Sequence, residues 1–69
     1  MNIRNLTARE VLRVLRSDGW YEVAQRGAHL HLEHPTKPGK VTVPVHGGTL
    51  PPGTLGSILR QAGLKGRRN

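Results

Sequence analysis

The sequence predicts one α+β domain with the element order α-β-β-β-α, in which two helices cover one face of a three-stranded antiparallel sheet. Three observations support this prediction. A capped amphipathic stretch comes first, three short sheet-favouring segments separated by turn residues follow, and a second apolar stripe at helical spacing comes after two prolines. At 69 residues the chain has room for a single small domain, expected to span residues 1–69.

The first helix is expected to run from Thr7 to about Asp18. Thr7 and Glu10 have the spacing of a capping box, in which each side chain bonds the other residue's backbone N–H. The expected apolar face consists of Ala8, Val11, Val14 and Leu15. Gly19 readily adopts a left-handed conformation and is therefore expected to end the helix.

The three strands are expected to form a meander. They span Trp20–Gln25, His29–His34 and Lys40–Val45, with a hairpin turn at Gly27 and a second turn at residues 35–39. In the middle strand Leu30 and Leu32 point to one face, and His29, His31 and Glu33 point to the other. In the third strand Val41, Val43 and Val45 share the apolar face. Pro44 has no backbone donor, which predicts that this strand lies at a sheet edge.

The second helix is expected to begin between Thr49 and Thr54, because Pro51 and Pro52 suit a first helical turn. Its apolar stripe is Leu55, Ile58, Leu59 and Ala62. Gly63 is expected to end this helix, and residues 65–69 read as a frayed basic tail.

The charge balance favours a polyanionic partner, either nucleic acid or an acidic protein. Eleven Lys and Arg stand against four Asp and Glu, giving a formal charge of +7. Arg9, Arg13 and Arg16 form a stripe on the first helix that can follow an RNA backbone, meet an acidic partner, or simply be solvated. Aromatic residues make up 3% of the chain, too few for a base-stacking platform, and Trp20 is expected to be a core or hinge residue.

Other composition features exclude several classes of protein. The chain has no Cys, which excludes disulfides, thiolate metal sites and a Cys nucleophile. No apolar run is long enough for a signal peptide or a membrane helix, so a soluble, intracellular protein with no membrane association is expected. The sequence Gly47-Gly48-Thr49 lacks the P-loop frame, and no cofactor is expected.

His29 is the candidate catalytic residue. It follows a glycine turn on the polar strand face, where an exposed imidazole can accept or donate a proton. Metal-free RNA cleavage needs a base for the 2′-hydroxyl, an acid for the leaving oxygen, and cations for the charge on phosphorus. His29 can fill either proton role, with Arg26, Lys37 and Lys40 supplying positive charge. The alternative is an exposed strand histidine without a function.

The other histidines are weaker candidates. His31 shares the face of His29 and is either a second proton-transfer group or, as favoured, a surface residue. His34 has the opposite strand parity and Glu33 is the only carboxylate nearby, so no metal site is expected. His46 either contacts phosphate or belongs to the turn with Gly47, and the turn is favoured.

Four segments occur in an order that resembles the HicA (YcfA-like) toxins of toxin–antitoxin pairs. They are Gly19-Trp20, Arg26-Gly27-Ala28-His29, Val43-Pro44-Val45-His46-Gly47 and the stretch from Gly53 to Leu64. The resemblance covers Leu6 to Leu64. It implies a small endoribonuclease that cleaves mRNA and is inhibited by a HicB-type antitoxin. The element order is that of the double-stranded-RNA-binding fold, and the scarcity of carboxylates predicts a metal-independent reaction. A cytoplasmic location is expected, because no signal peptide is apparent. A monomer is the expected state of the free chain.

The resemblance also implies a role for one residue. The family's catalytic histidine belongs to a Gly-Ser-His motif, which matches Gly27-Ala28-His29 and assigns the role to His29. Ala28 replaces the family's serine, so no hydroxyl is present at that position. Two non-enzymatic functions remain as alternatives, an RNA-binding module that uses the basic helix face and a basic adaptor for an acidic protein.

Overall fold

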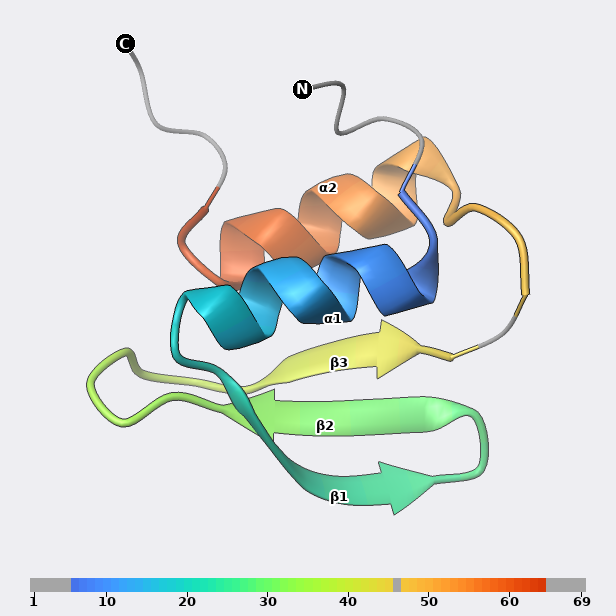
Figure 1. Cartoon of the computed structure of the whole chain (residues 1–69). Helices are drawn as coiled ribbons and strands as arrows, with labels where there is room; N and C mark the ends of the chain where they lie inside the picture. The colour runs from blue at the N-terminus through green and yellow to red at the C-terminus, as the bar shows by residue number, and fades with distance from the viewer. Residues whose placement is uncertain (1–5, 46, 65–69) are drawn as a thin grey trace, which may run out of the picture.

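The computed structural model describes residues 6–45 and 47–64, which form two helices and three strands in the predicted order. The elements are α1 (Ala8–Ser17), β1 (Tyr21–Arg26), β2 (His29–Glu33), β3 (Val41–Pro44) and α2 (Pro52–Gln61). Both helices lie side by side over the same side of the sheet (Figure 1). The predicted α-β-β-β-α fold is confirmed. The expected tail at residues 65–69 and His46 lie outside the described residues.

The sheet is an antiparallel meander in the order β1-β2-β3. A β-bulge lies between Glu22 and Ala24 on β1. Gly27 has φ +57°, so the hairpin between β1 and β2 uses a left-handed glycine, as predicted. β3 is an edge strand, which agrees with the expectation from Pro44.

The capping box of α1 is present. The Thr7 backbone N–H donates to Glu10 Oε1 at 2.9 Å, and the Glu10 backbone N–H donates to Thr7 Oγ1 at 3.1 Å. One part of the predicted apolar face is wrong: Leu12 is buried, whereas Val14 is only half-buried. Leu12 packs in the same buried cluster as Val11 and Leu15, so the buried face of α1 is wider than the predicted stripe.

The core lies between the helices and the inner sheet face. Its largest fully buried side chains are Trp20, Leu15, Leu32, Leu50, Val11, Val41 and Val43. Trp20 precedes β1 instead of starting it, and is a core residue as expected. Val45 lies beyond the end of β3 and is 37% exposed, contrary to its predicted place on the apolar face. The helices pack against β3, and all six residues of β1 are exposed.

Candidate active site

His29 begins β2, immediately after the Gly27–Ala28 turn, and its side chain is exposed. It is paired with Arg26 on β1 and with Pro44 on β3. Among residues 6–45 and 47–64, no hydrogen bond or ion pair holds its imidazole. Both ring nitrogens are therefore available to a ligand and to solvent.

His31 lies on the same sheet face in a different environment. Its Nδ1 is 3.0 Å from the Thr42 hydroxyl on β3, and the residue is half-buried. One of its two ring nitrogens is thus engaged by a neighbouring strand. The two histidines therefore differ: within the described residues, His31 is hydrogen-bonded through its ring and His29 is not.

Arg26 is the cation that the structure brings beside His29. The two residues face each other across the β1–β2 pair, so their side chains leave the same face of the sheet. Directly opposed residues have Cβ atoms about 5 Å apart. Arg26 is exposed, and no carboxylate in the described part of the chain pairs with it. A phosphate placed against His29 would therefore also lie within reach of this guanidinium.

Lys37 and Lys40 lie toward the opposite end of the sheet. Both belong to the connection after β2, whereas His29 begins that strand. At about 3.3 Å per residue, the strand separates its two ends by about 13 Å. Lys37 is also engaged: its Nζ donates to Asp18 Oδ2 at 2.5 Å and to the Ala62 carbonyl at 3.0 Å. The structure does not bring these two lysines to His29.

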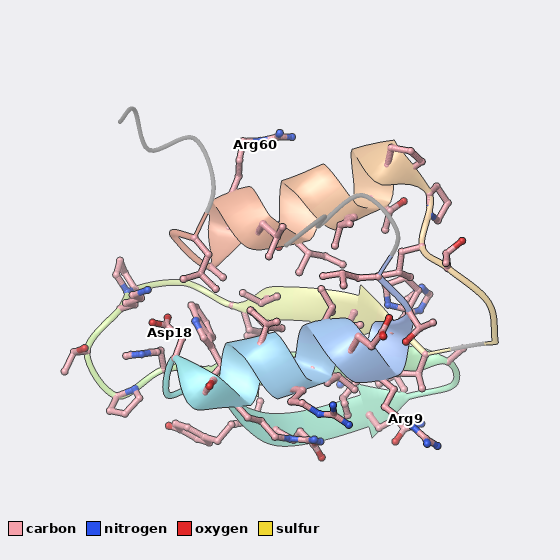
Figure 2. All side chains as sticks on the ribbon, turned by 45° about the horizontal axis from the view of Figure 1, so that its top comes forward. Arg9, Asp18 and Arg60 are labelled. Carbon is pink, nitrogen blue, oxygen red and sulfur yellow. The ribbon has the colours of Figure 1, made fainter. Side chains whose placement is uncertain are left out.

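The arginine stripe of α1 is exposed, as predicted, but its members differ in surroundings. Arg16 forms an ion pair with Glu22 on β1. Arg9 lies near the beginning of α1, at the opposite end of this helix from Asp18 (Figure 2). Arg9 and Arg16 line a groove on the molecular surface, and Arg13 does not.

This groove lies between one flank of α1 and the loop after β3, and has a volume of about 600 Å³. Besides the two arginines, its lining includes Leu12, Val45, Gly47 and Gly48. Sequence reasoning missed the groove because its two walls are distant in the chain. The only local hint of the groove in the sequence is the pair Gly47-Gly48, which also fits an ordinary turn.

Within the described ranges, no three His, Asp or Glu side chains are placed to hold a metal ion together. The same residues contain no helix that is long and apolar enough to cross a membrane.

The element order is that of the double-stranded-RNA-binding fold, and the chain is a small, strongly basic domain of this architecture. The family model described as the HicA toxin of bacterial toxin–antitoxin systems matches residues 8–64. Because the match spans most of the chain, the protein belongs to the HicA toxin family, as the sequence motifs indicated. Membership places it among the toxins of toxin–antitoxin systems. A search of curated proteins finds no match to this chain.

Proposed function

We propose that this protein is an endoribonuclease toxin that cleaves mRNA without a metal ion, with His29 as the proton-transfer residue. One observation carries the proposal. His29 is exposed at the start of β2 and lies directly opposite Arg26 on β1. Among the described residues, neither side chain has a hydrogen-bond or ion-pair partner. An acid or base beside a cation is the minimum set for attack of an RNA 2′-hydroxyl on the adjacent phosphate.

In the proposed step, the 2′-oxygen forms a bond to phosphorus while the bond from phosphorus to the 5′-oxygen breaks. The 2′-hydroxyl proton goes to a base, and the leaving 5′-oxygen receives a proton from an acid. His29 performs one of these two transfers, and water performs the other at this open surface. Arg26 stabilises the negative charge that grows on the phosphoryl oxygens. The products are a 2′,3′-cyclic phosphate and a 5′-hydroxyl.

Ala28 stands where the family has a serine, so the proposed chemistry uses no hydroxyl at this position. Its side chain offers no hydroxyl, and its carbonyl accepts a hydrogen bond from the Val45 backbone N–H at 2.6 Å. This backbone contact ties the turn before His29 to the segment after β3. His29 therefore follows directly on a turn that a backbone hydrogen bond holds in place.

The proposed partner is a HicB-type antitoxin that binds the free monomeric toxin and covers His29. A formal charge of +7 favours an acidic contact face on such a partner. Since the proposed substrate is mRNA, the activity belongs to the cytoplasm. An equimolar complex in which His29 still reacts with diethylpyrocarbonate would contradict inhibition by covering.

The test is cleavage of a long single-stranded RNA in the presence of EDTA by the purified protein and by His29→Ala. We expect cleavage by the native chain only. Equal cleavage by both would assign the reaction to another residue or to a contaminating nuclease. RNA binding without cleavage by either would instead identify a non-catalytic RNA-binding module.

A further inference from the structure

The groove beside α1 combines charge with an apolar wall. Arg9 and Arg16 stand seven residues apart on one flank of the helix, and Leu12 lies between them on the same flank. Seven residues of α-helix rise about 10 Å, and a stacked nucleic-acid strand rises about 3.4 Å per nucleotide. The two guanidinium groups can thus meet different phosphates of one strand, with an apolar side chain between them.

The opposite wall connects the groove to the candidate active site. Val45 lines the groove, and its backbone N–H donates to the carbonyl of Ala28, the residue before His29. The groove therefore opens at the end of the sheet where β2 begins. His29 and Arg26 leave the sheet face opposite the helices, so a strand that continues from the groove to these residues passes around this end of the sheet.

The wall next to Val45 has room for a backbone. A Cβ built on Gly47 or on Gly48 would meet no atom within 4 Å, so open space lies in front of both residues. A cavity of about 600 Å³ is within the range that holds small ligands, of the order of one or two nucleotides.

We propose that this groove is a binding subsite for the single-stranded nucleotides next to the cleaved bond. Arg9 and Arg16 contact their phosphates, and Leu12 with Val45 contacts a base or ribose. This inference rests on the proposed function, because it takes RNA as the substrate. It also divides the arginine stripe: Arg13 lies outside the groove and contributes only general attraction.

The observations favour a nucleic-acid strand over an acidic protein surface. The site is a concave groove with an apolar wall, not a flat cationic face. Of the two groove arginines, Arg16 is already paired with Glu22 of β1. This pair leaves Arg9 as the stronger of the two proposed phosphate contacts, because no carboxylate of the described residues neutralises it.

The first experiment measures binding of a fluorescein-labelled single-stranded RNA dodecamer in the His29→Ala background, where cleavage cannot interfere. We expect Arg9→Gln to weaken binding by about fivefold or more and to reduce the salt slope of log K by about 1. Arg16→Gln should have a smaller effect, because Glu22 already neutralises part of the Arg16 charge. The matched control is Arg13→Gln, on the same helix, with an expected change of less than about twofold. An equal loss from Arg13→Gln and Arg9→Gln would overturn the subsite.

A second pair of variants places the same negative charge inside and outside the groove. A Cβ on Gly47 meets no atom within 4 Å apart from its chain neighbours, so Gly47→Asp should fold. Gly53 also has open space in front of it and lies in the first turn of α2, where an acidic residue is favourable. We expect Gly47→Asp to weaken RNA binding by about fivefold more than Gly53→Asp. Equal effects would contradict the proposal.

Two further comparisons separate the possible failures. Polyglutamate serves as a probe for an acidic polypeptide, and its affinity should change little between Gly47→Asp and Gly53→Asp. An equal loss for polyglutamate and RNA would show a general anion surface and overturn the nucleotide subsite. If the native chain binds RNA in this pattern but never cleaves it, the groove stands and the nuclease proposal fails. If the native chain cleaves RNA but the variants do not differ in RNA binding as expected, the nuclease proposal stands and the groove subsite fails.

Discussion

Lys37 and Asp18 form an ion pair that joins the turn after β2 to the end of α1. Lys37 Nζ lies 2.5 Å from Asp18 Oδ2, and it also donates to the Ala62 carbonyl at the end of α2. Asp18 Oδ2 accepts a further hydrogen bond from Trp20 Nε1 at 3.2 Å. One lysine thus connects the ends of both helices with the β2–β3 turn. The Lys37 charge therefore stabilises the folded chain, at the end of the sheet away from His29.

This pair predicts a dependence of stability on acid pH. The hydrogen bond from Lys37 is the largest influence on the Asp18 carboxyl and, against the opposing effect of burial, holds its pKa below the ordinary value of 3.8. Because the folded pKa is depressed, the stabilisation is fully present above pH 3.8 and is lost as the pH falls through the folded pKa. Denaturant unfolding between pH 2 and pH 6, at about half-unit steps, measures the loss.

The matched variants for this pH prediction are Asp18→Asn and Glu33→Gln. We expect Asp18→Asn to cost about 1 kcal/mol at neutral pH and to flatten the acid-side slope. Glu33→Gln should keep the slope, since no partner within the described residues holds that carboxylate. A native slope that survives in Asp18→Asn would contradict the assignment.

Gly19 is predicted to be intolerant of a side chain for two reasons. Its φ is +109°, and a Cβ there would lie 2.7 Å from His34 Nε2. His34 Nδ1 accepts the backbone N–H groups of Thr36 and Lys37, so Nε2 is the nitrogen that donates to the Asp18 carbonyl at 2.6 Å. A methyl group would displace this ring as well as strain the backbone.

Gly39 provides the control for Gly19, because its φ is +83° but a Cβ there meets no atom within 4 Å. We expect Gly39→Ala to cost about 1–2 kcal/mol from backbone strain alone. Gly19→Ala should cost at least about 1 kcal/mol more, because it also breaks the partly buried hydrogen bond from His34 to the Asp18 carbonyl. Equal midpoints in urea, at equal slopes, would show that the contact with His34 contributes nothing.

Arg26 is predicted to act on the rate of RNA cleavage and only weakly on its binding. Arg26→Gln removes the cation opposite His29 and should lower the single-turnover rate by about tenfold to a hundredfold. Lys40→Gln removes the same charge near the far end of β2 and should leave that rate within about twofold. Saturating single-turnover kinetics measures both. An equal fall in the two variants would indicate a general charge effect.

The proposed use of the 2′-hydroxyl makes a prediction about the substrate. An RNA with one 2′-deoxy nucleotide at the cleaved position should remain intact at that bond, while neighbouring bonds are still cut. Mapping of labelled fragments reads this directly. Cleavage at the deoxy position would contradict the 2′-hydroxyl mechanism, because no nucleophile would remain on the sugar.

The sequence predicted the fold well because its signals are local. The Thr7–Glu10 capping box located the start of α1, alternation located β2, and Pro51 with Pro52 located the start of α2. Pro44 predicted the edge strand for a backbone reason that no tertiary contact can change. These features depend on residues within a few positions of one another.

The sequence predicted less about the site because the missing parts are long-range. Leu12 is buried and Val45 is exposed, and the two line a groove between α1 and the loop after β3, which periodicity cannot show. The pairing of Lys37 with Asp18 and Ala62 joins three segments that are distant in the chain. The turn before His29 and its place on the polar strand face were enough to predict it as a candidate. The sequence could not show that, within the described residues, His31 is hydrogen-bonded and His29 is not.

The central claim is that His29 moves a proton in RNA cleavage, and single-turnover cleavage in EDTA tests it most directly. The comparison uses the native chain, His29→Ala and His31→Ala, which removes the neighbouring histidine of the same face. We predict a fall of about 10²- to 10⁴-fold in His29→Ala with RNA affinity within about twofold of native, and near-native cleavage in His31→Ala. Native rates in His29→Ala would contradict the claim, as would a complete loss confined to His31→Ala.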